Sequence, residues 1–132
     1  MAFPTTFTHI YTQTVSAPEG ILQDDGQAYT GDTVVGGYWT VNANGGGANA
    51  ITLAFPATGF QSMLLFSTVP CVVTLTGVTV INGVTIGTVT LAANTLVHVT
   101  SITGACTAIS IGANTTGAGP AGKLSCSVLY NS

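Results

Sequence analysis

The chain has 132 residues, a formal net charge of −3, 46% hydrophobic residues and only 4% charged residues. This length fits one domain that buries a core, and the hydrophobic fraction excludes a disordered chain. Because Lys123 is the only basic residue and no apolar run approaches the roughly 20 residues of a spanning helix, we expect neither nucleic acid binding nor membrane insertion.

Short runs rich in Val, Ile and Thr, separated by turn residues, follow one another along the chain. They predict strands at 7–15, 33–41, 50–55, 60–68, 71–81, 84–91, 96–102, 105–111 and 123–130. Residues 60–68 are apolar on both faces and also fit a short helix, but their neighbours favour a strand. We therefore predict an all-β fold, an antiparallel β-sandwich like a jelly roll with about nine or ten short strands. It forms a single domain over 1–132, with 1–6 as an extended N-terminal arm.

Three segments have the composition of connections. Residues 16–25 contain Pro18, Gly20 and most of the charge, and the Ile21-Leu22 pair within them is expected to lie on a sheet edge. Residues 42–49 and 112–122 are rich in glycine, so we expect two loose, exposed loops. Gly36 and Gly37 inside the strand at 33–41 indicate a bulge or a close backbone approach.

Asn82 and Gly83 stand between two β-rich runs and give the strongest hairpin signal in the chain, because both residues accept the positive φ of a type I′ turn. The turn places the two runs side by side as antiparallel strands. The cross-strand pairs that it predicts are Ile81 with Val84 and Thr79 with Ile86.

In the run at 84–91, Val84 and Ile86 stand at even positions, and Val89 and Leu91 stand at odd positions. In a regular strand the two pairs would point to opposite faces, and Gly87 lies between them. A glycine bulge at this position keeps both apolar pairs on the core side of the strand. We therefore expect Val84, Ile86, Val89 and Leu91 to point into the core.

The low charge of the chain bears on its surface. Interface cores are depleted in charged residues, so a surface with so few of them favours contact with other chains. We expect a homo-oligomer.

Asp24, Asp25 and Asp32 form the only acidic group and are candidates for a weak cation loop that binds calcium together with backbone carbonyls. Their spacing does not match an EF-hand loop. The alternative is a solvated turn.

Cys71, Cys106 and Cys126, together with His9 and His98, are the residues that are able to bind a soft metal ion. The cysteines lie 35 and 20 residues apart, unlike the close pairs of zinc sites. Core packing, one disulfide or a metal site all remain open, and without a secretory signal reduced thiols are expected. We predict no cofactor and no metal.

Catalysis by a Ser or Cys nucleophile needs a histidine base and an orienting acid. No carboxylate precedes His98 within 65 residues, although folding can bring Asp32 close to it. We expect that the chain is not an enzyme, and a hydrolase built on His98 is the less favoured hypothesis.

Tyr38 and Trp39, with Tyr29 and Tyr11, are candidates for a platform on which sugar rings stack. Aromatic side chains also serve as core residues and interface anchors. Tyr38 and Trp39 are therefore predicted to form either a protein interface or a glycan platform.

The stretch TLTGVTVINGVTIGTVTLAANTLVHVTSITGACTAISI, with its Thr, Val and Gly texture and almost no charge, resembles accessory virion proteins of tailed bacteriophages. These are capsid decoration or cement proteins and the β-domains of head and tail fibres. The resemblance implies a structural virion protein that assembles as a homo-oligomer, often a trimer, on the major capsid protein or another virion protein. It implies no catalytic residues.

The start MAFPTTFTHIY lacks the features of a signal peptide. We therefore expect synthesis in the host cytoplasm and a final location in the virion. A carbohydrate-binding or adhesive β-sandwich module is the alternative function.

Overall fold

The structure of the protein is a computed structural model that describes residues 7–17 and 20–132, with side chains at residue 8 and from residue 29 onward. The part that it describes is all-β, with twelve strands and no helix. The strands are β1 (Phe7–Ala17), β2 (Gly20–Gly31), β3 (Thr33–Val41), β4 (Asn49–Ile51), β5 (Phe60–Ser67), β6 (Cys71–Thr76), β7 (Val80–Ile81), β8 (Thr88–Leu91), β9 (Thr95–Val99), β10 (Ile102–Thr103), β11 (Ala108–Ile111) and β12 (Gly122–Tyr130). The predicted all-β fold is confirmed.

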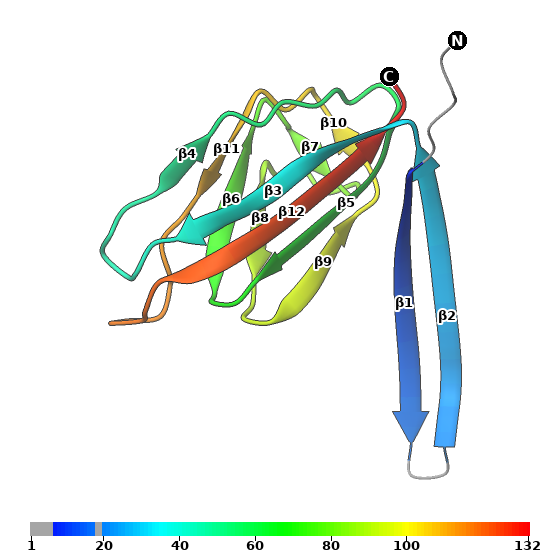
Figure 1. The fold of residues 1–132 in the computed structure, drawn as a ribbon, viewed down its shortest axis with the longest axis horizontal. Helices are drawn as coiled ribbons and strands as arrows, with labels where there is room; N and C mark the ends of the chain where they lie inside the picture. The colour runs from blue at the N-terminus through cyan, green and yellow to red at the C-terminus, as the bar shows by residue number, and fades with distance from the viewer. Residues whose placement is uncertain (1–6, 18–19) are drawn as a thin grey trace.

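Eight of these strands form two antiparallel sheets of four, which face each other as a sandwich (Figure 1). Sheet I has the order β3-β12-β5-β9, and sheet II has the order β4-β11-β6-β8. The first of the eight strands therefore pairs with the last, and the second pairs with the seventh. β7 and β10 form a separate small pair at one end of the sandwich.

The core lies between the two sheets and is built from alternate residues of each strand. In β6 the buried positions are Cys71, Val73 and Leu75, and the positions between them face outward. β5 is a strand, as its neighbours predicted, and its fully buried Met63 and Leu65 face sheet II. Alternation with a period of two is what a sheet with one covered face requires.

The turn at Asn82 and Gly83 is confirmed. Both residues have positive φ, 51° and 79°, and Ile81 and Val84 exchange two backbone hydrogen bonds of 2.9 Å. The predicted pair of Thr79 with Ile86 is wrong, because the Thr79 amide donates to the carbonyl of Thr103. Pairing resumes only between β6 and β8.

Val84 and Ile86 lie outside the core, against the prediction. They are 59% and 44% exposed, whereas Val89 and Leu91 are buried. The physical reason is that β7 leaves the direction of β6 to pair with β10, so the turn no longer extends sheet II. Gly87 serves a close approach, since a Cβ there would lie 2.6 Å from the carbonyl oxygen of Val78.

β1 and β2 pair along their length and form a two-stranded ribbon that extends beside the sandwich (Figure 1). The prediction of a connection at 16–25 is therefore wrong, because β1 continues to Ala17 and β2 begins at Gly20. Ile21 lies within β2, opposite Ser16 of β1. The predicted N-terminal arm at 1–6 lies outside the described residues, as do residues 18–19.

The two glycine-rich segments are loops, but they are tied to each other. Asn114 is only 2% exposed, and its side chain donates to the carbonyl of Pro120 and accepts from the amide of Thr116. The Asn44 side chain donates to the carbonyl of Asn114, and the Asn44 amide donates to Gly119. Hydrogen bonds between the segments replace the loose loops that their composition predicted.

Candidate interaction surface

The outer face of sheet I carries the largest exposed aromatic side chain of the described residues. The strand registers place Tyr38, Ser125, Phe66 and Leu96 in one row across the four strands. The next row is Gly36, Ser127, Leu64 and His98. We refer to these eight residues, with Val34 and Lys123 at the two ends of the face, as the outer face of sheet I.

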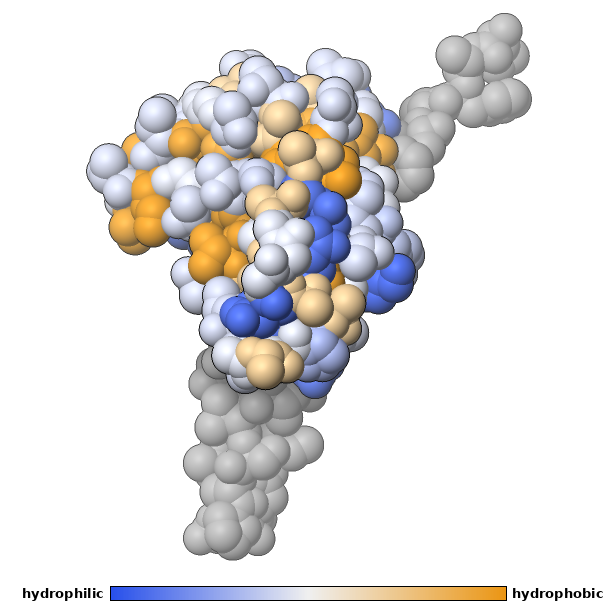
Figure 2. Space-filling view, turned by 90° about the vertical axis from the view of Figure 1, so that its left-hand side faces the viewer, coloured by the Kyte–Doolittle hydropathy of each residue, from blue (hydrophilic) through white to orange (hydrophobic). Residues whose placement is uncertain are grey.

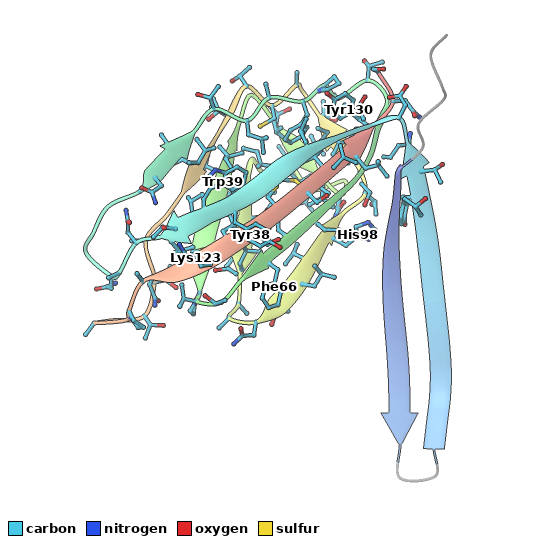
Figure 3. All side chains as sticks on the ribbon, viewed as in Figure 1. Tyr38, Trp39, Phe66, His98, Lys123 and Tyr130 are labelled. Atoms are coloured by element: carbon cyan, nitrogen blue, oxygen red, sulfur yellow. The ribbon has the colours of Figure 1, made fainter. Side chains whose placement is uncertain are left out.

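Side chains on this face are exposed or half-buried, and almost all are uncharged. Tyr38 is 78% exposed and Leu96 is 44% exposed, while Leu64 and Phe66 are half-buried. Figure 3 shows Tyr38, Phe66, His98 and Lys123 on the side of the sandwich formed by β3, β12, β5 and β9. Lys123 is the only charged residue among them, and its Nζ lies 3.2 Å from the Thr40 hydroxyl. Figure 2 shows the end of the sandwich that lies on the left in Figure 1, where hydrophilic and hydrophobic patches alternate.

Gly36 brings β3 unusually close to β12. A Cβ at this position would collide with the carbonyl oxygen of Cys126. The register between β3 and β12 runs without a shift, so of the two readings of the glycine pair the close approach is confirmed and the bulge is wrong. Gly36 has no side chain, and Ser125 and Ser127 of β12 have short ones, so the residues beside Tyr38 on this face are small.

The predicted joint platform of Tyr38 and Trp39 is wrong. Successive residues of a strand point to opposite faces, so Tyr38 is exposed while Trp39 packs against the core. Gly37 makes room for the indole, since a Cβ there would lie 3.2 Å from Trp39 Cζ2. Tyr29 lies at the end of β2 against His98, and the side chain of Tyr11 is outside the described set.

Ser62, His98 and Tyr29 meet at one edge of this face. Ser62 Oγ and His98 Nε2 are 2.8 Å apart, and the Tyr29 ring stands edge-on to the imidazole with ring centroids 4.8 Å apart. Ser62 is fully buried, so its hydroxyl is covered in this arrangement. Burial lowers the pKa of His98 and favours its neutral form.

The ribbon joins the sandwich at a buried point on the same sheet. A Cβ at Gly31 would lie 2.8 Å from the carbonyl oxygen of Tyr130 and close to the Leu129 side chain, and Leu129 itself is fully buried. Asp32 accepts hydrogen bonds from the Ser132 amide and hydroxyl and from the Thr33 hydroxyl. The Ser132 amide and the Thr33 hydroxyl lower the pKa of the Asp32 carboxyl.

Asp24, Asp25 and Asp32 do not share one loop. Asp24 and Asp25 lie within β2, opposite Thr14 and Gln13. Asp32 follows the end of that strand, so at about 3.3 Å per residue it lies roughly 25 Å from Asp24. The prediction of one cation loop is therefore wrong, because the intervening chain is extended.

The three cysteines are free and buried. Cys71 Sγ lies 3.6 Å from the Ser67 hydroxyl, and Cys106 Sγ lies 3.3 Å from the carbonyl of Ala108. Burial raises the pKa of all three thiols, and with the added effect of Cys106 it raises the pKa of Cys126 to about 12. Core packing, a disulfide and a metal site were the alternatives left by the sequence, and core packing describes the state of the three cysteines here. The side chain of His9 is outside the described set.

The described residues hold neither a pocket nor a cluster of three potential metal ligands. They also contain no helix of the length and apolarity needed to cross a membrane.

The sequence analysis missed Phe66 and Leu96 as surface residues. The signal for Phe66 was present, because residues 60–68 are apolar on both faces and a strand with two apolar faces needs a cover on each side.

No family model, curated protein or solved structure matches this chain.

Proposed function

We propose that this chain is a structural virion protein, a capsid decoration or cement protein or a component of a head or tail fibre, that assembles through the outer face of sheet I. The observation that carries the proposal is the uncharged face around Tyr38, Phe66 and Leu96, on which the exposed side chains are apolar or short and polar. Interface cores are rich in aromatic residues and poor in charge.

The energetics of such a face suit assembly. Burying charged side chains costs desolvation energy, whereas tyrosine, phenylalanine and leucine bury apolar area without it. Tyr38 stands on a strand whose backbone is paired with β12 over its whole length, so little backbone conformational freedom is lost when its side chain is covered. Rigid aromatic residues of this kind are frequent binding hot spots.

The strand order also supports this class of function. Numbered along the chain from β3 to β12, the eight strands of the two sheets have the orders 1-8-3-6 and 2-7-4-5. This interleaving is the one expected of a jelly roll, an architecture that recurs in viral capsid and lectin domains. The sequence resemblance to accessory proteins of tailed phages adds the virion as location, a trimer as the favoured oligomer and the major capsid protein as the favoured partner.

Carbohydrate binding is the second candidate, and a single observation favours it. Tyr38 is an open aromatic ring beside the small residues Gly36, Ser125 and Ser127, and sugar rings stack on such surfaces. Trp39, however, is partly buried against the core, so the platform has one exposed aromatic ring instead of two.

The test is the native mass of the protein at low micromolar concentration, measured by size exclusion with light scattering. We expect a stable oligomer for the wild-type chain and for Thr74→Asp, a matched change at an exposed position on the outer face of sheet II. Tyr38→Asp is expected to give folded monomers. A wild-type monomer, or an oligomer that tolerates Tyr38→Asp, contradicts the proposal, and glycan binding lost in Tyr38→Ala then supports the alternative.

A further inference from the structure

We propose that the β1–β2 ribbon of one copy lies across the outer face of sheet I of a second copy. This inference rests on the proposed function and names the contact that builds the assembly. The proposed contact joins the ribbon, which is a separate sheet from the two sheets of the sandwich, to the outer face of sheet I (Figure 1).

The ribbon needs a surface to lie on. It is a sheet of two strands, paired regularly from Phe7 with Gly31 to Ala17 with Gly20 and interrupted by one shift. An isolated two-stranded hairpin is at best marginally stable in water. Beyond its own pairing, β2 reaches β5 and β12, at the junction where Gly31 packs beside Leu129.

The dimensions of the two surfaces agree. At about 3.3 Å per residue, the twelve residues of β2 extend roughly 40 Å, and the nine residues of β12 extend roughly 30 Å. Two strands about 4.8 Å apart are narrower than the four strands of sheet I. One ribbon is therefore long enough to cover the part of the face that the ribbon of the same copy leaves open.

The charges of the two surfaces are complementary. Two of the four acidic residues of the chain, Asp24 and Asp25, lie in β2 of the ribbon. The only basic residue, Lys123, is exposed at one end of the outer face of sheet I. A ribbon laid along that face brings the acidic part of one copy to the single cation of another.

The ribbon of the same copy covers one edge of this face, where Tyr29 lies against His98 and Gly31 packs beside Leu129, but it leaves Tyr38 open. Tyr38, near the middle of β3, is 78% exposed, and the ribbon extends beside the sandwich (Figure 1). The side chains of Tyr38, Phe66 and Lys123 are therefore accessible to a ribbon that comes from outside (Figure 3).

Disulfide trapping tests this arrangement in the full-length protein. The variant Asp24→Cys with Lys123→Cys places one thiol on the ribbon and one on the face. The variant Asp24→Cys with Thr74→Cys is the matched control, because Thr74 is exposed on sheet II. The native thiols are buried and do not compete. After oxidation with oxidised glutathione, we expect covalent dimers and larger species of the first variant and at least about tenfold less of them in the control.

Three results overturn the inference. The first is equal cross-linking of the two variants, the second is no cross-linking of the first variant, and the third is a disulfide confined within one chain. The native mass of the wild-type protein separates this failure from that of the proposed function. If the wild-type chain is an oligomer and the ribbon thiol does not reach residue 123 of another copy, only the ribbon contact is wrong.

Discussion

The two outer faces of the sandwich differ although each belongs to an antiparallel sheet of four strands and both enclose the same core. The outer face of sheet I carries Tyr38, Phe66 and Leu96. The corresponding row on sheet II is Ala50, Ser110, Thr74 and Thr88. Threonine and serine keep a β surface hydrated without charge. Exposed aromatic and leucine side chains instead lower the free energy when another surface covers them.

The comparison teaches that low charge alone does not define the interaction surface of this protein. Both faces are nearly free of charge, but only sheet I has large apolar side chains, the cation and the attachment point of the ribbon. We therefore expect the two faces to differ in the free energy gained on association as well as in composition.

The inner sides of the two sheets are expected to be equally inaccessible to solvent and to thiol reagents. Cys71 belongs to sheet II and Cys126 to sheet I, and burial raises the pKa of both thiols. In the native protein each should react with a thiol reagent at pH 8 at least about a thousandfold more slowly than in denaturant, because reaction requires opening of the fold. A thiol that reacts at the unfolded rate shows that its sheet is open, contrary to the structure.

Removing the one fully buried leucine on the outer side of sheet I should have a large effect. Leu129→Ala leaves a cavity beside Gly31 and should lower the free energy of unfolding by about 3 kcal/mol. Thr74→Ala, exposed on sheet II, should change it by less than about 0.5 kcal/mol. Urea unfolding of the two variants measures both values, and a Leu129→Ala value near that of the control shows that β2 does not cover this part of the sheet.

A matched pair of half-buried residues compares the two faces directly. Phe66→Ala on sheet I should weaken self-association about tenfold, the effect of losing a modest hot spot. Val72→Ala on sheet II should leave the association constant unchanged. Sedimentation equilibrium gives both constants, and equal effects of the two substitutions mean that the faces do not differ in function.

The smallest effect is a dependence on pH that belongs to sheet I alone. Burial lowers the pKa of His98, so between that pKa and the usual 6.5 the unfolded chain binds more protons than the folded protein. Stability is therefore full above pH 6.5 and falls as the pH is lowered through this window. Thermal unfolding at pH 7 and pH 5 should show a smaller loss for His98→Gln than for the wild type, and equal losses exclude His98 as the cause.

Much of the fold was predictable because its signals are local. The strand at 33–41 has the predicted bounds, and the strand at 60–68 ends one residue early. The turn at Asn82 and Gly83 forms because two residues with positive φ are required there and these two accept it. The same turn did not reveal that β7 pairs with β10, since that partner lies about twenty residues further along the chain.

The candidate site was less predictable. Tyr38 is exposed, as a surface contact requires, but its grouping with Trp39 ignored the alternation of strand residues. The segment at 16–25 combines proline, glycine and charge, which are signals of a turn, and these signals concealed two strands that continue into the segment and pair with each other. The tie between the two loops through Asn114 joins residues about seventy positions apart, and no local pattern reports such a contact.

The sequence by itself determined an all-β chain, the positions of most strands and one tight turn, because backbone preferences and the two-residue period act over a few neighbouring residues. Only the tertiary structure decided which side of each strand is covered. The period of two separates the faces of a strand, but the second sheet determines which face becomes core. For that reason Trp39 packs against the core, Val84 is left outside it, and the uncharged surface is divided into a threonine face and an aromatic one.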